Sequence, residues 1–426
     1  MGQPLRLHRR MLMLSAAGLL APISLCARPG KDAAPPIRCA DFLASIGVNT
    51  HIAYLGSQYE DVEPLTDALS YVGVKHVRDV AINALNPNVE HYAALASAGV
   101  NFCMFWGVKR TMANAIDEIA AFEAAYPGAV HALEGPNEIK ASFAYAGLGG
   151  NAAGRAFMAD MRRAARSNPA LRDKPLVNFT GDPPCAADCD FANAHPYPKG
   201  GRQPGRPLQA ARVQNVGPSG VMPGKPMVFT EFGYHTLVGK PAKAGAWQGV
   251  DPETQAVLLI NGLLDNAAAG VTRTYIYQLF DAYPDSNPGV DQERHFGLFA
   301  VDGAAKPAAN ALKTLRVILA EEGANAARFP PSLLAAHVDV ASPLSCLRLR
   351  NDAGRAFLAF WNETPIWDSG AARPIAVEPI LAKVTLHRPA PMQAFDPFNP
   401  IGNKDFGVAT SASVSVGAHP IVLRLG

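Results

Sequence analysis

The chain has 426 residues, more than one ordinary domain needs, and 49% of them are hydrophobic, so a large core is available. Its 38 Lys and Arg residues nearly balance 36 Asp and Glu residues, and the formal net charge is +2. This balance gives no indication of a nucleic acid or an anionic membrane as partner. The sequence contains no low-complexity tract and no internal repeat.

The first 27 residues have the pattern of a signal peptide. Three arginines, the last at position 10, precede an apolar run from Met11 to Leu25, and small residues follow at Cys26 and Ala27. The run is too short for a comfortable membrane span. We therefore predict cleavage near residue 27 and export to the periplasm or the extracellular space, by the general or the twin-arginine route. Residues 28–37, rich in Pro, Gly and charge, are predicted to be a linker, and no other segment is predicted to span a membrane.

Between residues 38 and 324, short apolar runs alternate with helical segments. Strands are expected at 46–51, 74–78, 100–106, 130–133, 176–180, 191–195, 227–231 and 274–280. Helices are expected at 60–71, 88–97, 113–126, 152–167, 207–216, 253–269 and 306–321. Too few residues separate the fifth strand from the sixth for a helix to fit. The alternation predicts an α/β fold, a (β/α)8 TIM barrel. A doubly wound open sheet would want a glycine-rich phosphate loop after an early strand, and the sequence has none.

From residue 325 to residue 426 the pattern changes. Short apolar runs, often alternating with polar residues, are separated by turn residues at 335–340, 346–350, 356–361, 382–386 and 420–425. This pattern is typical of an antiparallel sheet. We predict a small C-terminal β-sandwich domain after the barrel.

After cleavage, five cysteines remain, at positions 39, 103, 185, 189 and 346. Cys185 and Cys189 share one turn-rich loop and could form a disulfide in an oxidising compartment. A metal site there is the alternative, but no cluster of histidines supports it. Cys103 lies inside an apolar run and is expected to be a small buried hydrophobe. The sequence predicts no cofactor and no bound metal.

Two glutamates follow predicted strands. Glu138 follows the fourth strand in Leu133-Glu134-Gly135-Pro136-Asn137-Glu138, and Glu231 lies in Phe229-Thr230-Glu231-Phe232-Gly233 at the end of the seventh. Two carboxylates on the C-terminal rim of a parallel barrel are what a retaining glycosidase needs. We predict that Glu138 is the acid/base and Glu231 the nucleophile. The alternative is that both are ordinary surface glutamates at strand ends.

These motifs resemble glycoside hydrolase clan A, the retaining (β/α)8-barrel glycosidases, and in particular family 39 and its relatives. In that clan an Asn-Glu pair, here Asn137-Glu138, ends strand four, and a second glutamate, here Glu231, ends strand seven. Ala194-His195-Pro196-Tyr197 is similar to the clan's strand-six end, and the predicted C-terminal β-domain matches a common arrangement in the clan. Gly297-Leu298-Phe299, Asp302-Gly303 and Lys306-Pro307-Ala308 are similar to the stretch after strand eight. The resemblance implies a secreted retaining glycosidase that cleaves O-glycosidic bonds of a poly- or oligosaccharide.

The sequence departs from the clan at the end of strand eight. Many clan members place a tryptophan there under the sugar, whereas this chain has Tyr277-Gln278-Leu279-Phe280. The resemblance therefore does not identify the residue that forms the sugar platform, and with it the substrate. The sequence contains no signal of the sugar, the linkage, endo or exo action, or the oligomeric state.

The retaining mechanism assigns opposite charge states to the two glutamates. Glu138 must arrive protonated, so we expect its pKa to be raised by the nearby Glu231 carboxylate and by burial. Glu231 must be ionised and needs hydrogen-bonding or positive neighbours. Arg78, at the end of strand two, resembles the clan's arginine at that place; the alternative is a structural ion pair with Asp79 or Glu60. Glu134 is expected to support the strand-four loop or to orient Arg78.

Further side chains are expected to bind the substrate. The clan places Asn137 on the sugar 2-hydroxyl, unless this residue only forms a turn. His195 and Tyr197 are expected to bind sugar hydroxyls or to hold Glu231, although His195 could be purely structural. Gln278 is predicted to reach the same pocket. Trp106, at the end of strand three, is predicted either to stack on a sugar face or to cap the barrel core.

Two other functions compete with a glycosidase. A carbohydrate-binding barrel without turnover is disfavoured because both carboxylates are present. A metal-dependent barrel hydrolase would want a His-x-His pair on strand one, where the sequence offers only His51.

Overall fold

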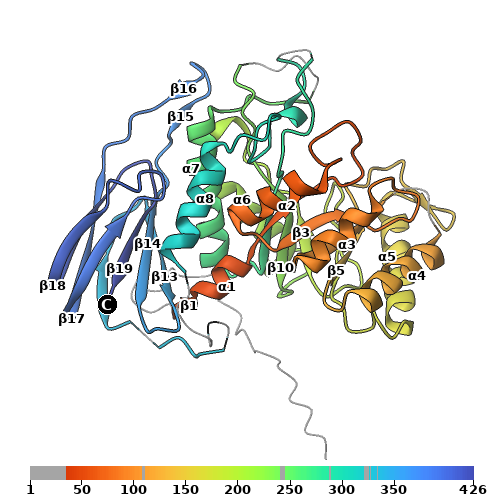
Figure 1. Ribbon diagram of the computed structural model, residues 1–426, viewed down its shortest axis with the longest axis horizontal. Coiled ribbons are helices and arrows are strands. Elements are labelled where there is room, and N and C mark those ends of the chain that lie inside the picture. Colours follow the sequence, from red (N-terminus) through yellow and green to blue (C-terminus); the bar gives the residue numbers. More distant parts are fainter. Residues whose placement is uncertain are drawn as a thin grey trace, which may run out of the picture.

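The computed structural model of the protein describes residues 35–107, 111–239, 245–286, 289–320, 326, 328–332 and 334–426. The predicted signal peptide, residues 28–34 of the predicted linker and the predicted domain boundary at 324 and 325 lie outside these ranges. The chain forms a barrel of eight parallel strands with surrounding helices, and an antiparallel C-terminal sheet lies beside it (Figure 1). The predicted fold class, a (β/α)8 TIM barrel with a C-terminal antiparallel β-domain, is confirmed; the domain that was predicted as a β-sandwich is built from one seven-stranded sheet.

The barrel contains all eight expected strands. They are β2 (Ile46–Asn49), β3 (His76–Val80), β4 (Asn101–Trp106), β5 (Val130–Pro136), β8 (Leu176–Val177), β9 (Ala192–Ala194), β10 (Met227–Phe232) and β11 (Arg273–Ile276). Neighbours pair in parallel, and β11 pairs with β2. A single parallel bridge between Val177 and Phe191 joins β8 to β9 and closes the barrel. As predicted, residues 178–191 contain no helix between these two strands.

The seven expected helices occur in the expected order, and one further helix that was not expected precedes β2. They are α1 (Cys39–Ala44), α2 (Val62–Val72), α3 (Val89–Ser97), α4 (Met112–Ala125), α5 (Gly150–Ser167), α6 (Gly205–Val216), α7 (Pro252–Ala268) and α8 (Pro307–Ile318). Local chemistry sets their ends: α2 stops at Gly73, whose φ of 62° is left-handed, and the Asp251 carboxylate caps α7 by accepting from Thr254 N–H. None of the helices in the described ranges is both long and apolar enough to cross a membrane.

Shorter elements lie in the loops. They are the hairpin β6 (Ala144–Tyr145) and β7 (Leu148–Gly149), the hairpin β15 (Trp367–Asp368) and β16 (Arg373–Pro374), and the 3-10 turns η1 (Lys199–Gly201) and η2 (Gln292–Arg294).

The C-terminal unit is one bent sheet that curves around its own core. Its strands are β12 (Ala336–Asp339), β13 (Leu344–Arg350), β14 (Ala356–Asn362), β17 (Ile380–Phe395), β18 (Lys404–Val416) and β19 (Ile421–Leu425), with β1 (Ile37–Arg38) at one edge. The long β17 pairs with β12 in its first half, with β19 in its second half, and with β18 along both. The end of the predicted linker therefore joins this sheet, since β1 pairs in parallel with β13.

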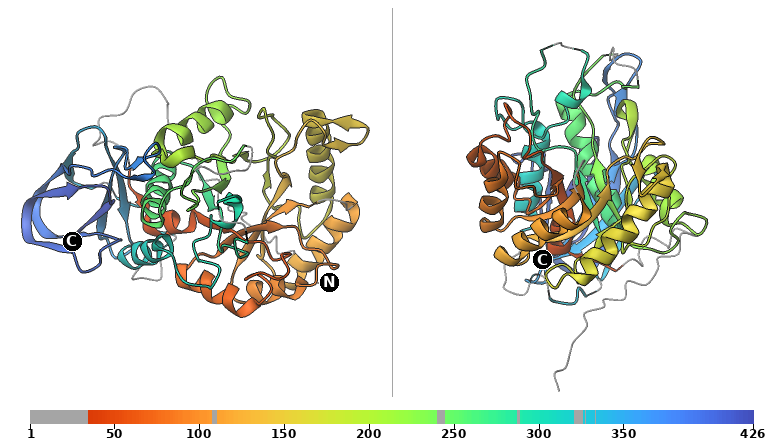
Figure 2. Two further views of the ribbon diagram at one scale, coloured as in Figure 1. Left: turned by 90° about the horizontal axis from the view of Figure 1, so that it is seen from above. Right: turned by 90° about the vertical axis from the view of Figure 1, so that its right-hand side faces the viewer.

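Strand β14 connects the two cores of the protein because its side chains alternate between two faces. Leu358 and Phe360 point into the core enclosed by the bent sheet, whereas Phe357 and Trp361 belong to the barrel's core cluster. Figure 1 shows β13 and β14 lying against α7 and α8, and the left view of Figure 2 shows the C-terminal sheet beside the barrel. A strand buried on both faces reads as a continuous apolar run, as Ala356–Trp361 does.

An acidic pair lies where β14 meets α7. The Trp361 indole N–H is 3.2 Å from Asp265 Oδ1 and 3.3 Å from Glu363 Oε1. Burial, and after it the Glu363 carboxylate, holds the pKa of Asp265 well above its usual range. Because an unfolded Asp ionises near pH 4, the folded state loses stability as the pH rises above that value towards the raised pKa.

Asp265→Asn should remove this loss. We expect the variant to be more stable than wild type by at least about 1 kcal/mol at pH 9, with a smaller difference at pH 4.5. Urea unfolding at the two pH values measures both. A difference between the two proteins that does not change with pH would show that Asp265 is ionised throughout.

Candidate active site

The barrel brings the two predicted catalytic glutamates to its C-terminal rim. Glu231 lies within β10, and its side chain is 9% exposed. Glu138 follows β5, and its side chain is 55% exposed and open to an incoming ligand. The Glu138 backbone has a φ of 45°, which a non-glycine residue adopts rarely, and its N–H donates to Thr180 Oγ1 at 2.8 Å. Such strained positions cluster at functional sites.

Gly135 allows the acid-bearing end of β5 to lie close to the next strand of the barrel. A Cβ atom at Gly135 would lie 2.8 Å from Phe179 Cβ and 2.9 Å from Phe179 N. The motif around Glu138 therefore needs a glycine here for steric reasons, independently of any contact with a ligand.

Two donors fix the Glu231 carboxylate. Arg78 Nη1 donates to Oε1 at 2.7 Å, and the Tyr197 hydroxyl donates to Oε2 at 2.5 Å. These two donors hold the carboxylate group of Glu231 in one orientation. Arg78 and Tyr197 thus lie where the sequence analysis expected neighbours of Glu231.

Arg78 is the centre of the buried polar network. Its Nε and Nη2 atoms donate to the two Glu134 oxygens at 2.7 and 2.9 Å, and Nη2 also donates to Asn137 Oδ1 at 2.5 Å. The guanidinium packs 4.3 Å from the Phe105 ring centroid. Burial alone would lower the pKa of Arg78, but Glu134 and Glu231 outweigh it, and the pKa is raised. Glu134 therefore orients Arg78, which is one of the two roles that the sequence analysis expected for it.

His195 lies between the two predicted catalytic carboxylates. Its Nδ1 atom lies 2.9 Å from Glu138 Oε1 and 3.5 Å from Glu231 Oε2, while Nε2 lies 2.9 Å from Thr230 Oγ1. This hydrogen bond is the main cause that lowers the pKa of Glu138, against the opposing effect of burial. The expectation of a raised Glu138 pKa is therefore wrong for the ligand-free protein. The expectation took the Glu231 carboxylate and burial into account but not the imidazole donor between the two carboxylates.

The two carboxylates are close together. One oxygen of Glu138, one oxygen of Glu231 and a ring nitrogen of His195 all lie within 4.8 Å of one another. Carboxyl groups about 5 Å apart are typical of retaining glycosidases, whereas inverting enzymes need roughly 6.5–9.5 Å to admit a water molecule. The distance between the Glu138 and Glu231 oxygens agrees with the shorter of these two separations.

The same three side chains have the donor types that bind zinc. The Nδ1 atom of His195, however, is 2.9 Å from Glu138 Oε1, a hydrogen-bond distance. Two ligands on a tetrahedral zinc ion would be about 3.3 Å apart. The contact between His195 and Glu138 is therefore a hydrogen bond between the imidazole and the carboxyl group.

The remaining predicted residues lie at different depths. Asn137 directs its side-chain oxygen to Arg78. Gln278 is buried, accepts from the Tyr59 hydroxyl at 3.5 Å and donates to the Glu293 carbonyl at 3.1 Å. Trp106 is only 8% exposed and packs edge-on against Phe157 in the core, which is the core-capping alternative.

Sequence reasoning missed three polar residues that complete the network. Asn49 accepts from Arg78 Nη1 at 3.0 Å and donates to the Thr230 carbonyl. Thr230 donates to Glu134 or Asn193, whose oxygens both lie 2.9 Å from its hydroxyl. The signal was present: each is a polar residue inside an otherwise apolar barrel strand, near its C-terminal end.

Tyr277 directly follows β11, in the stretch where the sequence departs from the clan pattern. Its ring packs edge-on against His51, Tyr197 and Phe296, with centroids 5.3–6.1 Å apart. The ring is half-buried beside the Glu231 partner Tyr197. It can therefore offer an aromatic surface to a ligand.

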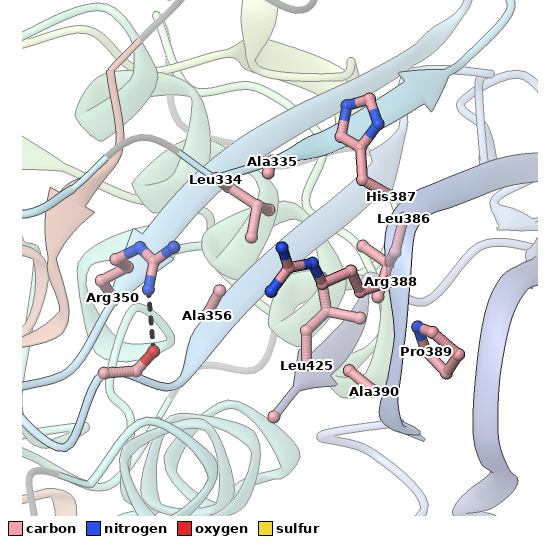
Figure 3. Close-up of a pocket in the computed structure, with 12 residues that line it drawn as sticks. Leu334, Ala335, Arg350, Ala356, Leu386, His387, Arg388, Pro389, Ala390 and Leu425 are labelled. Carbon is pink, nitrogen blue, oxygen red and sulfur yellow. Dashed lines mark hydrogen bonds between the residues drawn. The ribbon is translucent and has the colours of Figure 1, made fainter.

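Two other features lie apart from this site. A pocket of about 440 Å³ on the C-terminal sheet is lined by Leu334, Arg350, Leu386, His387, Arg388 and Leu425 among others, and Figure 3 shows it without a carboxylate pair. Cys185 and Cys189 are free thiols: Arg155 donates to Cys185 Sγ at 2.9 Å, and Cys189 Sγ lies 3.3 Å from the Phe191 carbonyl oxygen.

A closed barrel of eight parallel strands that carries two carboxylates on its C-terminal rim has the architecture of the (β/α)8 glycosidases. Solved structures confirm the resemblance at the level of fold. A family 39 glycoside hydrolase from Bacteroides cellulosilyticus WH2 shares 12% sequence identity and a TM-score of 0.58, over 92% of this chain and 83% of that chain.

Two further structures show the same likeness. A GH39 enzyme from Xanthomonas axonopodis pv. citri has 13% identity and a TM-score of 0.54, over 92% of this chain and 95% of its own. A monomeric beta-xylosidase from Caulobacter crescentus CB15 has 15% identity and a TM-score of 0.54, over 92% and 97%. No protein-family model and no curated protein sequence matches the chain.

Proposed function

We propose that the protein is an exported retaining glycosidase that hydrolyses O-glycosidic bonds of a poly- or oligosaccharide. The observation that carries this proposal is the placement of two carboxylates within 4.8 Å, one held by Arg78 and Tyr197 and the other hydrogen-bonded to His195. The similarity in fold to family 39 enzymes supports it.

The reaction would proceed in two displacements. Glu138 gives its proton to the leaving oxygen while a Glu231 oxygen bonds to the anomeric carbon and the glycosidic C–O bond breaks. In the second step Glu138 takes a proton from water, whose oxygen displaces Glu231 from the sugar and restores the original configuration. Tyr197 and Arg78 hold Glu231 in one orientation throughout, which lowers the entropic cost of reaching the transition state. The Tyr277 ring is the proposed platform for the sugar.

A screen of the purified protein against aryl glycosides and polysaccharides tests this function. The panel should include aryl xylosides, because one structure of similar fold is a beta-xylosidase. We expect hydrolysis with retained configuration, observed by NMR of the first-formed sugar, and no effect of EDTA. Glu231→Gln is the matched control because it keeps the shape but removes the nucleophile; its activity should fall by about 10³-fold or more.

The second candidate function, a carbohydrate-binding barrel without turnover, gives a different result. Wild-type protein would then bind a glycan, observed by calorimetry, and release no sugar. Activity that EDTA abolishes would instead favour a metal-dependent hydrolase.

Export is a separate part of the proposal and rests on the pattern of residues 1–27. Intact mass spectrometry of the protein from its native host should give a chain that starts near residue 28 outside the cytoplasm. Cytoplasmic protein that keeps Met1 would contradict export without affecting the proposed chemistry.

A further inference from the structure

The hydroxyl group of Thr230 lies between the catalytic pair and a third, fully buried carboxylate. Its Oγ1 atom is 2.9 Å from each of three atoms: His195 Nε2, Glu134 Oε1 and Asn193 Oδ1. A threonine hydroxyl has one proton and can donate to only one of them. The position of that proton determines which hydrogens the His195 ring carries.

Two of the three neighbours can only accept. Glu134 is 0% exposed and receives two hydrogen bonds from Arg78, so it is a carboxylate. The orientation of the Asn193 amide is fixed, because Oδ1 accepts from Thr230 N–H at 3.2 Å and Nδ2 donates to the Asn178 carbonyl at 3.2 Å. The imidazole nitrogen alone can serve as either donor or acceptor.

The Thr230 hydroxyl group is best placed to donate its hydrogen bond to Glu134. A bond to a carboxylate is charge-assisted and roughly twice as strong as one between neutral groups. The Thr230 oxygen then presents a lone pair to His195, so Nε2 must carry a hydrogen. Without it, two lone pairs would face each other at 2.9 Å in a buried place.

The other side of the ring then determines the proton that Glu138 needs. With a hydrogen on Nε2, the 2.9 Å contact between Nδ1 and Glu138 Oε1 requires one further proton between these atoms. It lies on Nδ1 beside a carboxylate, or on Oε1 beside a neutral ring. If the pair lost this proton, the lone pair of Nδ1 would face the Glu138 carboxylate. The ring could avoid this only by carrying its hydrogen on Nδ1 instead of Nε2, which would break the hydrogen bond to Thr230.

We propose that Glu134, acting through Thr230, holds His195 with its hydrogen on Nε2 and thereby keeps the transferable proton in the His195–Glu138 pair. Glu134 and Thr230 are positioning residues, since neither reaches the rim. This inference deepens the proposed function and rests on it for its meaning. The lowered pKa of Glu138, whose largest cause is the hydrogen bond to His195, agrees with a ring that donates to this carboxylate.

Charged groups face the His195–Glu138 pair from several elements. Glu138 and, at 3.5 Å, Glu231 face Nδ1, and both favour a hydrogen on that atom. Arg78 and Lys140 lower the pKa of Glu138 from further away. Only the contact of Thr230 with Nε2 favours a hydrogen on the opposite nitrogen, so its removal should show directly in the ring.

Nitrogen NMR of the ligand-free protein tests this without any substrate. In protein labelled with ¹⁵N-histidine, His195→Asn identifies the His195 signals by their loss. We expect wild-type His195 to retain the hydrogen on Nε2 across the pH titration. Thr230→Val has the same shape without the hydroxyl. In this variant the His195 ring should lose its Nε2 hydrogen and become the Nδ1–H form at a pH about one unit lower than the wild-type ring loses a proton, since one such hydrogen bond is worth about tenfold.

Thr230→Ser restores the hydroxyl and should restore the wild-type signals, which a purely structural effect of position 230 would not do. Glu134→Gln removes the charge and keeps the shape, and it should shift the His195 titration in the same direction as Thr230→Val. If Thr230→Val does not fold, the His195 signals of Glu134→Gln test the proposal instead. Wild-type His195 in the Nδ1–H form, or a titration unchanged in both variants, would overturn the proposal. Because the readout needs no turnover, a failed glycoside screen and a failed tautomer prediction are distinguishable.

Discussion

Replacing Glu138 with alanine should slow the hydrolysis of glycosides with poor leaving groups by about 10²–10⁴-fold, the usual contribution of a general acid. Aryl glycosides with good leaving groups should still react with Glu231, because an activated phenolate departs without a proton. The glycosyl-enzyme should then accumulate, since no base activates water for the second step. Intact mass spectrometry of the variant would detect the added sugar.

Azide should rescue the same variant. The anion needs no base and fits the space that the missing side chain leaves, so turnover should return and give a glycosyl azide of retained configuration. Glu231→Gln is the control, because it should form no covalent adduct with either class of glycoside and should not respond to azide. Wild-type rates of Glu138→Ala on both classes would show that Glu138 is not the acid/base.

Most of the barrel could be predicted because buried parallel strands are continuous apolar runs. Met227–Phe232 is buried at every position and was expected within one residue. Strand β18 was missed, since Lys404–Val416 contains mainly Ser, Ala, Val and Gly and its outer face is exposed. The sequence also gave no reason to pair Ile37–Arg38 with Leu349–Arg350, because such pairing depends on how two distant segments meet.

The catalytic candidates could be predicted because charged side chains at the ends of apolar strands need an explanation. Glu138, Glu231 and Arg78 satisfied that criterion, and the structure brings all three together. Asn49 and Thr230 are uncharged and common at strand ends, so their place in the network emerged only from the closed barrel. The direction of the Glu138 pKa shift depends on a contact between two loops, which sequence spacing cannot supply.

Arg78→Met should destabilise the protein by about 3–5 kcal/mol, the usual cost of removing one partner from a buried ion pair. The arginine is 2% exposed and its main partner Glu134 is 0% exposed, so the variant leaves a carboxylate in the barrel without its counter-charge. Arg78→Lys should recover only part of this loss. A single ammonium cannot reproduce the fork that binds Glu134 twice and reaches Glu231 with another nitrogen. The midpoint of urea unfolding measures both variants.

Two comparisons separate the buried charge from a general effect of removing an arginine. Arg38→Met breaks an ion pair with Asp41 in which the side chains are 28% and 48% exposed, and it should cost less than about 1 kcal/mol. Adding Glu134→Gln to Arg78→Met should regain part of the lost stability, because it removes the charge that lacks a partner. If Arg78→Met is no less stable than Arg38→Met, or if Glu134→Gln makes it worse, then the Glu134 carboxylate is not the source of the cost. The network would in that case be held by packing around Phe105 and not by its charges.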